Sequence, residues 1–255
     1  MTFRRPSLFA VADLHLPGGQ KKPMDVFGSH WKDHFERISK DWRQRVAPED
    51  LVLIPGDISW AMQLSEALPD LEDIAALPGR ILLLRGNHDY WWGSLTQLRA
   101  ALPENMHAIQ NDAYDAGFCV VCGTRGWEIP PEKGADPQNV KVYEREIGRL
   151  RLSLAAAARI TRGRPLIAMM HYPPLYPEMR ERGTEMSRLL TEAGVKRCVY
   201  GHLHGPHTRK GLHETVDGVR YDLTSCDSLG FRLLDVTPEN SNEGSEGSGD
   251  SISAN

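Results

Sequence analysis

The chain has 255 residues, enough for one large domain with a substantial hydrophobic core. Apolar residues make up 40% and charged residues 25%, as in ordinary globular domains, and no apolar stretch reaches the ~18 residues of a membrane-spanning helix. The net charge of −4 comes from residues 237–255, which hold four acids and no Lys or Arg. Residues 1–236 are therefore neutral and lack the basic surface of a protein that binds long nucleic acid or an anionic membrane.

The N-terminal segment "RRPSLFAVA" (4–12) has the basic start and small-residue end of a secretory signal. Its apolar part is about six residues, shorter than the ~7–15 residues that such a signal needs. Asp13 and His15 follow at once, so we interpret the segment as a first strand. Together with four cysteines, which suit a reducing compartment, this predicts a cytoplasmic protein.

Apolar runs followed by turn residues predict five buried strands. They cover residues 7–15, 50–57, 80–89, 165–171 and 196–204. Helical apolar stripes lie between them. One runs through residues 25–46 (Phe27, Trp31, Phe35, Ile38 and Trp42) and the other through residues 140–160 (Tyr143, Ile147, Leu150 and Leu154). Alternating strands and helices predict an α/β fold, in which ligands gather at the carboxyl ends of the strands.

Two pairs of residues have metal-ligand spacing but are better explained by packing. Cys119 and Cys122 lie in an apolar strand pattern (117–123), where side chains three apart point to opposite faces, so we expect small core residues. His30 and His34 lie four apart, but no H-E-x-x-H glutamate accompanies them. We expect them on the polar flank of the first helix.

Each of the five predicted strands ends in Asp, Asn or His side chains. One such residue is usually part of a turn, but hydrophobic strands gain nothing from ending in seven nitrogen and oxygen donors unless a cation holds them together. The candidate ligands are Asp13, His15, Asp57, Asn87, His171, His202 and His204. Imidazole and carboxylate donors suit Mn, Fe or Zn alike. Seven ligands exceed the need of one ion with an open position, and they predict two divalent ions with a bridging carboxylate.

The motifs that carry these donors resemble, in order and spacing, those of the calcineurin-like metallophosphoesterases. They are DLH (13–15), GD (56–57), GNHD (86–89), His171 and GHLH (201–204). The resemblance implies an α/β fold of the four-layer α/β/β/α sandwich type, with two central mixed sheets. It also implies that one ion is held by Asp13, His15 and His204, that the other is held by Asn87, His171 and His202, and that Asp57 bridges them.

The same resemblance implies that His88 faces the substrate instead of a metal. A histidine there can protonate the leaving group or stabilise charge on the phosphoryl oxygens, typically worth roughly 10²–10⁴-fold in rate. We expect Asp89 to fix the loop. Arg125 is a candidate to pair with phosphate oxygens, and Trp60 and Trp91 are candidates to stack on a base. The alternative for both tryptophans is packing in the core or in a lid.

We therefore expect residues 1–236 to form one metallophosphoesterase catalytic domain. The expected reaction is hydrolysis of a phosphomonoester or phosphodiester of a small molecule or nucleotide by metal-activated water. The text "GDISWAM" (56–62) differs from the "GDxVDRG" of family members that act on phosphoproteins, and His88 stands where lipid A precursor hydrolases carry Arg. The alternatives are a non-catalytic scaffold that retained the fold and a single-zinc hydrolase of amides or lactones. No feature of the sequence indicates an oligomeric state.

Residues 237–255 are rich in Ser, Gly, Asn and Glu and contain one large apolar residue, Ile252. Such a segment cannot bury enough surface to offset its ordering entropy. We expect a disordered tail.

Overall fold

The computed structural model describes residues 4–19 and 24–238. The first of its two sheets has the strand order β11-β1-β2-β3-β4. Its strands are β1 (Leu8–Ala10), β2 (Leu51–Ile54), β3 (Arg80–Leu84), β4 (Met106–Ile109) and β11 (Leu234–Asp235). Only β11 pairs antiparallel, because the other four strands are joined by crossovers that contain helices.

The second sheet has the order β5-β6-β7-β8-β10-β9. Its strands are β5 (Ala113–Asp115), β6 (Val120–Thr124), β7 (Leu166–Met170), β8 (Arg197–Tyr200), β9 (His213–Val216) and β10 (Val219–Leu223). The four central strands run parallel, and the edge strands β5 and β9 pair antiparallel. Both sheets are therefore mixed.

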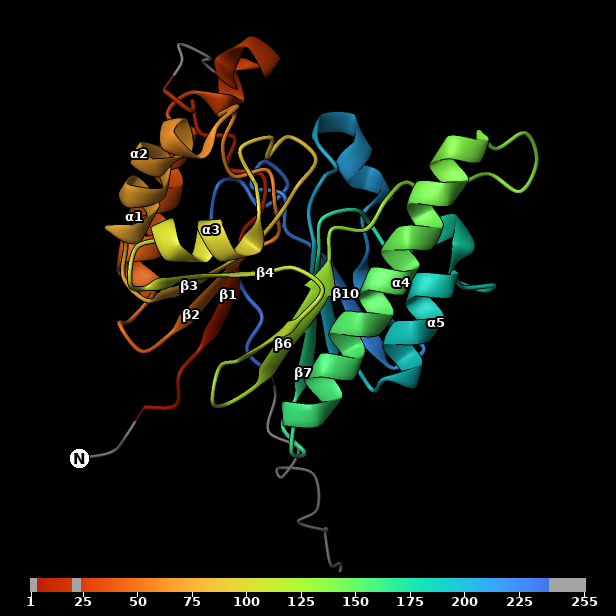
Figure 1. Ribbon diagram of the computed structural model, residues 1–255. Helices are drawn as coiled ribbons and strands as arrows, with labels where there is room; N and C mark the ends of the chain where they lie inside the picture. Colours follow the sequence, from red (N-terminus) through yellow and green to blue (C-terminus); the bar gives the residue numbers. More distant parts are fainter. Residues whose placement is uncertain (1–3, 20–23, 239–255) are drawn as a thin grey trace, which may run out of the picture.

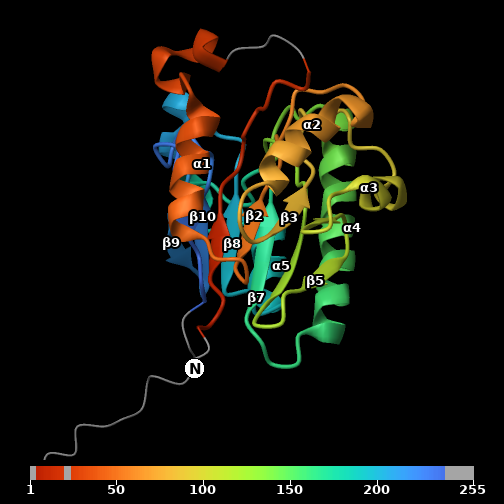
Figure 2. The same cartoon turned by 90° about the vertical axis from the view of Figure 1, so that its left-hand side faces the viewer.

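Helices cover the outer face of each sheet (Figures 1 and 2). The first sheet is covered by α1 (His34–Arg45), α2 (Leu64–Ala75) and α3 (Leu95–Ala101), and the second by α4 (Pro137–Ile160) and α5 (Glu185–Glu192). Four 3₁₀ turns complete the described elements: η1 (Met24–Phe27), η2 (Ser29–Trp31), η3 (Pro177–Met179) and η4 (Gly205–Lys210). The predicted four-layer α/β/β/α sandwich with two central mixed sheets is confirmed.

The core has three parts because each sheet is apolar on both faces. Between the sheets, Leu53 and Leu82 of the first pack with Ile167 and Val199 of the second. The other two parts lie under α1–α3 and under α4–α5. Near-continuous apolar strands such as "LVLI" (51–54) are typical of sheets buried on both faces.

The two helix predictions had different outcomes. The helix predicted over 140–160 is confirmed as α4, which starts after Asp136, whose carboxylate accepts a hydrogen bond from Gln138 N at 3.1 Å. The continuous helix predicted over 25–46 is wrong. Gly28 (φ 133°) and Asp33 (φ 52°) interrupt it, so the chain forms η1, η2 and α1 instead, and Phe27 is 64% exposed.

The cysteines are all free and buried, as expected of core residues. Cys122 packs in the core under α4 and α5, whereas Cys119 packs between the sheets. The two therefore lie on opposite faces of the second sheet, as the strand period predicted. His34 differs from its expected place on a polar flank, since its Nε2 lies 2.8 Å from the Leu14 carbonyl oxygen.

The predicted tail begins at Thr237, whose hydroxyl accepts a hydrogen bond from Leu8 N at 2.9 Å. The rest of it, residues 239–255, lies outside the described residues. None of the helices in the described part of the chain is both long and apolar enough to cross a membrane.

Candidate metal centre

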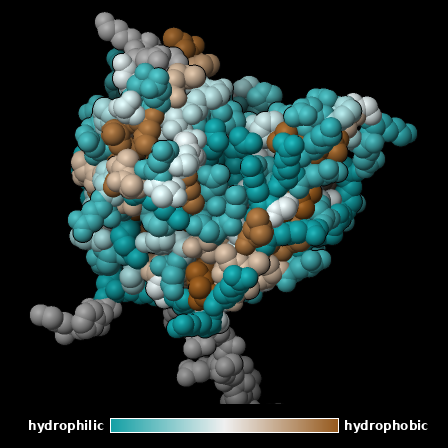
Figure 3. Space-filling view, in the orientation of Figure 1, coloured by the Kyte–Doolittle hydropathy of each residue, from teal (hydrophilic) through white to brown (hydrophobic). Residues whose placement is uncertain are grey.

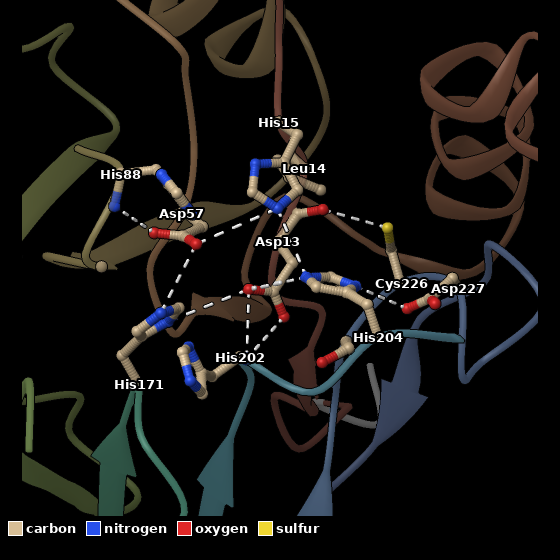
Figure 4. Close-up of polar contacts among 12 residues, drawn as sticks. Asp13, Leu14, His15, Asp57, His88, His171, His202, His204, Cys226 and Asp227 are labelled. Atoms are coloured by element: carbon tan, nitrogen blue, oxygen red, sulfur yellow. Dashed lines mark hydrogen bonds and ion pairs between the residues drawn. The ribbon is translucent and has the colours of Figure 1, made fainter. Parts of the chain in front are cut away.

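All seven predicted ligands lie in one place, at the carboxyl ends of parallel strands from both sheets. The first sheet supplies Asp13 and His15 after β1, Asp57 after β2 and Asn87 after β3, and the second supplies His171 after β7 and His202 and His204 after β8. In Figure 4 the side chains of Asp13, Asp57, His171 and His204 point toward a common centre. The parallel strands explain this convergence, since their ends meet at one edge of each sheet.

The backbone at this edge is strained. Asp13 (φ 61°), His15 (φ 45°), Asp57 (φ 52°) and His202 (φ 75°) are all left-handed, at a cost of roughly 1–3 kcal/mol each. Hydrogen bonds between neighbouring loops hold this conformation: Asp13 N donates to Gly56 O at 3.0 Å, and His15 N donates to Asp57 O at 2.9 Å. Such strain is concentrated at functional sites, because the surrounding structure must compensate for it.

Two motif glycines allow the loops to approach closely. A Cβ on Gly86 would lie 2.1 Å from Asp57 Oδ1, and a Cβ on Gly201 would lie 2.4 Å from Asp13 Oδ2. Any side chain at either position would therefore displace a candidate ligand. This is the physical role of the glycine in the GNHD and GHLH motifs.

Asp13, His15 and His204 form the first cluster. Their ligand atoms lie within 4.8 Å of one another. His15 Nε2 lies 3.3 Å from His204 Nε2, which lies 3.7 Å from Asp13 Oδ1. The Nδ1 of His204 lies 3.0 Å from Asp227 Oδ1, so the Nε2 side of the ring faces the cluster. This partner orients the imidazole as carboxylates do in known metal centres.

The second cluster surrounds His171. His171 Nε2 lies 2.7 Å from Asn87 Oδ1 and 3.5 Å from Asp57 Oδ2, while its Nδ1 lies 2.9 Å from the Pro55 carbonyl oxygen. The Asn87 oxygen is also 3.0 Å from His202 Nδ1. Asp57 Oδ2 lies 3.9 Å from His15 Nε2, so its carboxylate stands between the two clusters.

The electrostatics of the two buried carboxylates fit a cationic occupant. Burial, followed by the negative charge of Asp13, raises the pKa of Asp57 to about 8. Burial alone would also raise the pKa of Asp13, but the facing His204 holds it below its usual value. Two acids this close cannot both ionise easily without added positive charge. Together with imidazole nitrogens aimed inward, they form a donor set that suits divalent metal ions.

His88 contributes through its backbone as well as its ring. Its N–H donates to Asp57 Oδ1 at 2.8 Å, while its ring lies 4.5 Å from the Trp60 ring and 5.8 Å from the His15 ring, measured between centroids. The imidazole is thus beside the metal clusters without belonging to either.

Asp89 fixes the loop, as its position in the motif suggested. Its carboxylate is fully buried and accepts backbone hydrogen bonds from Asp57, Gly86 and Ile58 at 2.7–2.9 Å. It therefore ties the turn after β2 to the turn after β3.

The candidate substrate residues have different environments. The partly buried Trp60 stacks on His15, with centroids 4.7 Å apart. Trp91 is only 2% exposed and donates its indole N–H to Asp89, which favours the core-packing alternative over base stacking. Arg125 accepts the His171 N–H on its backbone carbonyl at 3.0 Å, and its guanidinium lies over the Trp127 ring.

Two residues beside the centre were not identified from the sequence. Asp227, which orients His204, follows β10, a sixth strand end that fits the same pattern as the other five. The run "VRYDL" (219–223) carries charges at alternate positions, so it lacks the continuous apolar pattern by which the other buried strands were predicted. Tyr172 directly follows His171, and its ring lies 4.0 Å from the His202 ring.

Comparisons with known proteins agree with this geometry. The family model of calcineurin-like phosphoesterases matches residues 7–206. Among curated protein sequences, none matches the chain significantly.

Solved structures show the same fold at low identity. The phosphopantetheinyl hydrolase PptH from Mycobacterium tuberculosis is 15% identical with a TM-score of 0.56, the match covering 92% of this chain and 96% of that one. TT1561 from Thermus thermophilus is 14% identical with a TM-score of 0.55, over 91% and 98% of the two chains. With the family model matching most of its length, the chain belongs to the calcineurin-like phosphoesterases and is a metal-dependent phosphoesterase.

Proposed function

We propose that this protein is a dinuclear phosphohydrolase that cleaves a phosphomonoester or phosphodiester of a small molecule or nucleotide. One observation carries the proposal: the Asp57 carboxylate stands between two clusters of candidate ligands, 3.9 Å from His15 Nε2 and 3.5 Å from His171 Nε2. A carboxylate with two oxygens can span two cations and offset part of their charge.

The candidate ligands would form two metal sites that share one carboxylate. One ion would be held by Asp13, His15 and His204, the other by Asn87, His171 and His202, with Asp57 shared. Two divalent ions there would supply an activated water and polarise the phosphoryl group. Mn, Fe and Zn all suit these donors. The His88 imidazole, outside both clusters, would deliver a proton to the leaving oxygen.

The substrate class has separate support. The PptH neighbour is named a phosphopantetheinyl hydrolase, and that name supports a phosphoester substrate here too. Residues 1–236 carry no net charge and so lack the basic surface that binding to a long nucleic acid requires. Four free, buried thiols support a cytoplasmic location.

Turnover and metal content together test this function. We expect the full-length protein loaded with Mn²⁺ to hydrolyse p-nitrophenyl phosphate or bis(p-nitrophenyl) phosphate, and a chelator to abolish the activity. Elemental analysis should give two ions per chain in the wild type and fewer in Asp57→Asn. Asp222→Asn changes another buried carboxylate, which pairs with Arg197 and Arg220 and with no candidate ligand. It is the matched control and should keep two ions.

The outcomes separate the alternatives. Two retained ions in Asp57→Asn would exclude the bridge. A wild-type protein that holds two ions but cleaves no ester would instead be the non-catalytic scaffold.

A further inference from the structure

A cavity of about 270 Å³ lies beside the metal centre. It is formed by the carboxyl ends of β3, β4 and β6 and by the first half of α4. Its charged lining residues are Arg85, Arg125, Arg145, Arg149 and Glu146. In Figure 3 hydrophilic side chains dominate the upper middle of the view, between the layer of α1–α3 and the layer of α4 and α5.

The single acid of this lining cannot neutralise the four arginines. Glu146 is fully buried, and its Oε1 lies 2.5 Å from Arg149 Nη1. Its Oε2 accepts hydrogen bonds from Thr124 Oγ1 at 2.6 Å and Gly126 N at 3.2 Å. Arg125 reaches Glu146 only at 3.7 Å. The lining therefore carries a net positive charge after its own ion pairs are counted.

Several of its donors have no acceptor in the protein. Among the described residues, the guanidinium groups of Arg85 and Arg145 form no hydrogen bond or ion pair, although the charges of Asp89 and Glu146 act on Arg85 from nearby. The Nε atoms of Arg85 and Arg125 are buried and unpaired, and so is the neighbouring Trp127 Nε1. Buried donors, above all charged ones, are costly without an acceptor. Guanidinium groups match the oxygens of phosphate in pairs, so the missing acceptor has the character of a phosphate.

The cavity adjoins the metal centre through short connections. Arg85 lies two residues before the candidate ligand Asn87. The Arg125 guanidinium lies 4.8 Å from the Trp127 ring, which lies 5.3 Å from Tyr172. Tyr172 in turn contacts the His202 ring. The backbone carbonyl of Arg125 also accepts the N–H of the candidate ligand His171 at 3.0 Å, so the cavity wall and the candidate ligands are direct neighbours.

We propose that this cavity binds a second phosphoryl group of the substrate, and hence that the substrate carries two phosphoryl groups. One is cleaved at the metal centre, and the other is held by Arg85, Arg125 and Arg145. This inference rests on the proposed phosphohydrolase function. A free phosphate ion has the same chemistry, so the experiment must distinguish it from a group on the substrate.

The decisive measurement compares Michaelis constants for matched esters with one and two phosphates. Adenosine 5′-monophosphate and adenosine 3′,5′-bisphosphate form one pair, and fructose 6-phosphate and fructose 1,6-bisphosphate form another. With the metal-loaded full-length enzyme, we expect a lower KM for the bisphosphate of at least one pair. Arg145→Gln, at an exposed position, should raise the ratio of bisphosphate to monophosphate KM about tenfold, because a charge-assisted hydrogen bond is lost.

Two further variants complete the design. Arg85→Gln should raise the same ratio, and it keeps the test valid if Arg145→Gln folds poorly. Arg159→Gln removes an exposed arginine from the last turn of the same helix, outside the cavity, and should leave the ratio as in the wild type. Equal ratios in the wild type, Arg145→Gln and Arg85→Gln would overturn the proposal.

A direct binding measurement distinguishes a failure of this proposal from a failure of the proposed hydrolase function. Calorimetric titration of the chelated full-length protein should show bisphosphate binding that Arg145→Gln weakens about tenfold. This result would support the cavity even if the metal-loaded protein cleaved no ester, which would refute only the hydrolase. If inorganic phosphate binds in the cavity while the bisphosphate binds no tighter than the monophosphate, the site serves a free ion and the proposal is wrong.

Discussion

The His88 side chain can be removed without breaking the bond that holds Asp57, because the backbone N–H of His88 makes that bond. We therefore expect His88→Ala to keep both metal ions and to lose roughly 10²–10⁴-fold in kcat on an aryl phosphate ester. Elemental analysis and steady-state kinetics check the two parts. Full activity in the metal-replete variant would remove His88 from the mechanism.

Asp227 acts on the metal centre through another residue. It lies 3.0 Å from His204 Nδ1 and also accepts the Gly205 N–H at 2.9 Å, so it fixes both the ring and the loop that carries it. We expect Asp227→Ala to weaken metal binding about 10–100-fold, as loss of an orienting carboxylate does in other metal sites.

Competition with a coloured chelator measures this affinity. Asp227→Asn keeps an oxygen acceptor and should lose less. Equal affinity in the wild type and Asp227→Ala would show that the His204 ring is held by its other contacts alone.

The segment between β3 and α3 contains two glycines, of which only one has no space for a side chain. A Cβ on Gly86 would overlap the Asp57 carboxylate, whereas a Cβ on Gly93 would meet only Gln97 Oε1, at 4.0 Å. We expect Gly86→Ala to cost about 1–3 kcal/mol in the free energy of unfolding and to reduce the metal content. Gly93→Ala, the matched control, should stay within about 0.5 kcal/mol of the wild type. Denaturant unfolding of Gly86→Ala with no such loss would contradict the close approach.

Strand β10 carries a buried acid whose contribution to stability depends on pH. Burial alone would raise the pKa of Asp222, but hydrogen bonds from His213 and Arg220 and the charge of Arg197 lower it below its usual value. An acid with a lower pKa in the folded chain stabilises the fold above its unfolded pKa of ~3.9, and this contribution is lost as the pH falls through the folded pKa.

We therefore expect Asp222→Asn to lower the free energy of unfolding by about 1–3 kcal/mol at pH 7, and the difference from the wild type to shrink below about pH 4. Urea unfolding at both pH values tests this. Glu181→Gln, at an exposed position with no ion pair to the described residues, should change stability little at either pH. A difference that persists undiminished in acid would show that Asp222 acts by packing and not by charge.

The metal centre joins the two halves of the molecule. The first sheet supplies Asp13, His15, Asp57 and Asn87, and the second supplies His171, His202 and His204. Bound ions would therefore link the sheets as well as neutralise the buried acids. Metal at 100 times its dissociation constant stabilises a fold by ~2.7 kcal/mol, which is on the order of 5–10 °C in Tm for a chain of this size.

We expect a chelator to lower the Tm of the wild type by about that amount, and to lower that of Asp57→Asn less. Differential scanning fluorimetry measures both. An identical Tm with and without chelator would mean that the seven side chains hold no structural metal.

Several features of the fold were predictable because they depend on local pattern. Apolar periodicity located the five strands and α4, but the strands are shorter than predicted: β1 ends at Ala10, β3 at Leu84 and β8 at Tyr200, before the donor residues. The helix predicted over 25–46 failed because Gly28 and Asp33 adopt φ values outside the helical region, while the apolar stripe continues across the break. A hydropathy pattern indicates which side chains are buried, but it does not indicate whether the residues between them form one continuous helix.

The sequence by itself identified the candidate ligands, since a strand end and its polar residues are neighbours along the chain. Only the tertiary structure decided which donors face each other, that Trp91 is buried and that Asp227 supports His204. It also placed Arg85, Arg125 and Arg145, which are far apart in sequence, around one cavity. The physical reason is that these contacts join segments of different strands and helices, and no local period records how two sheets stack.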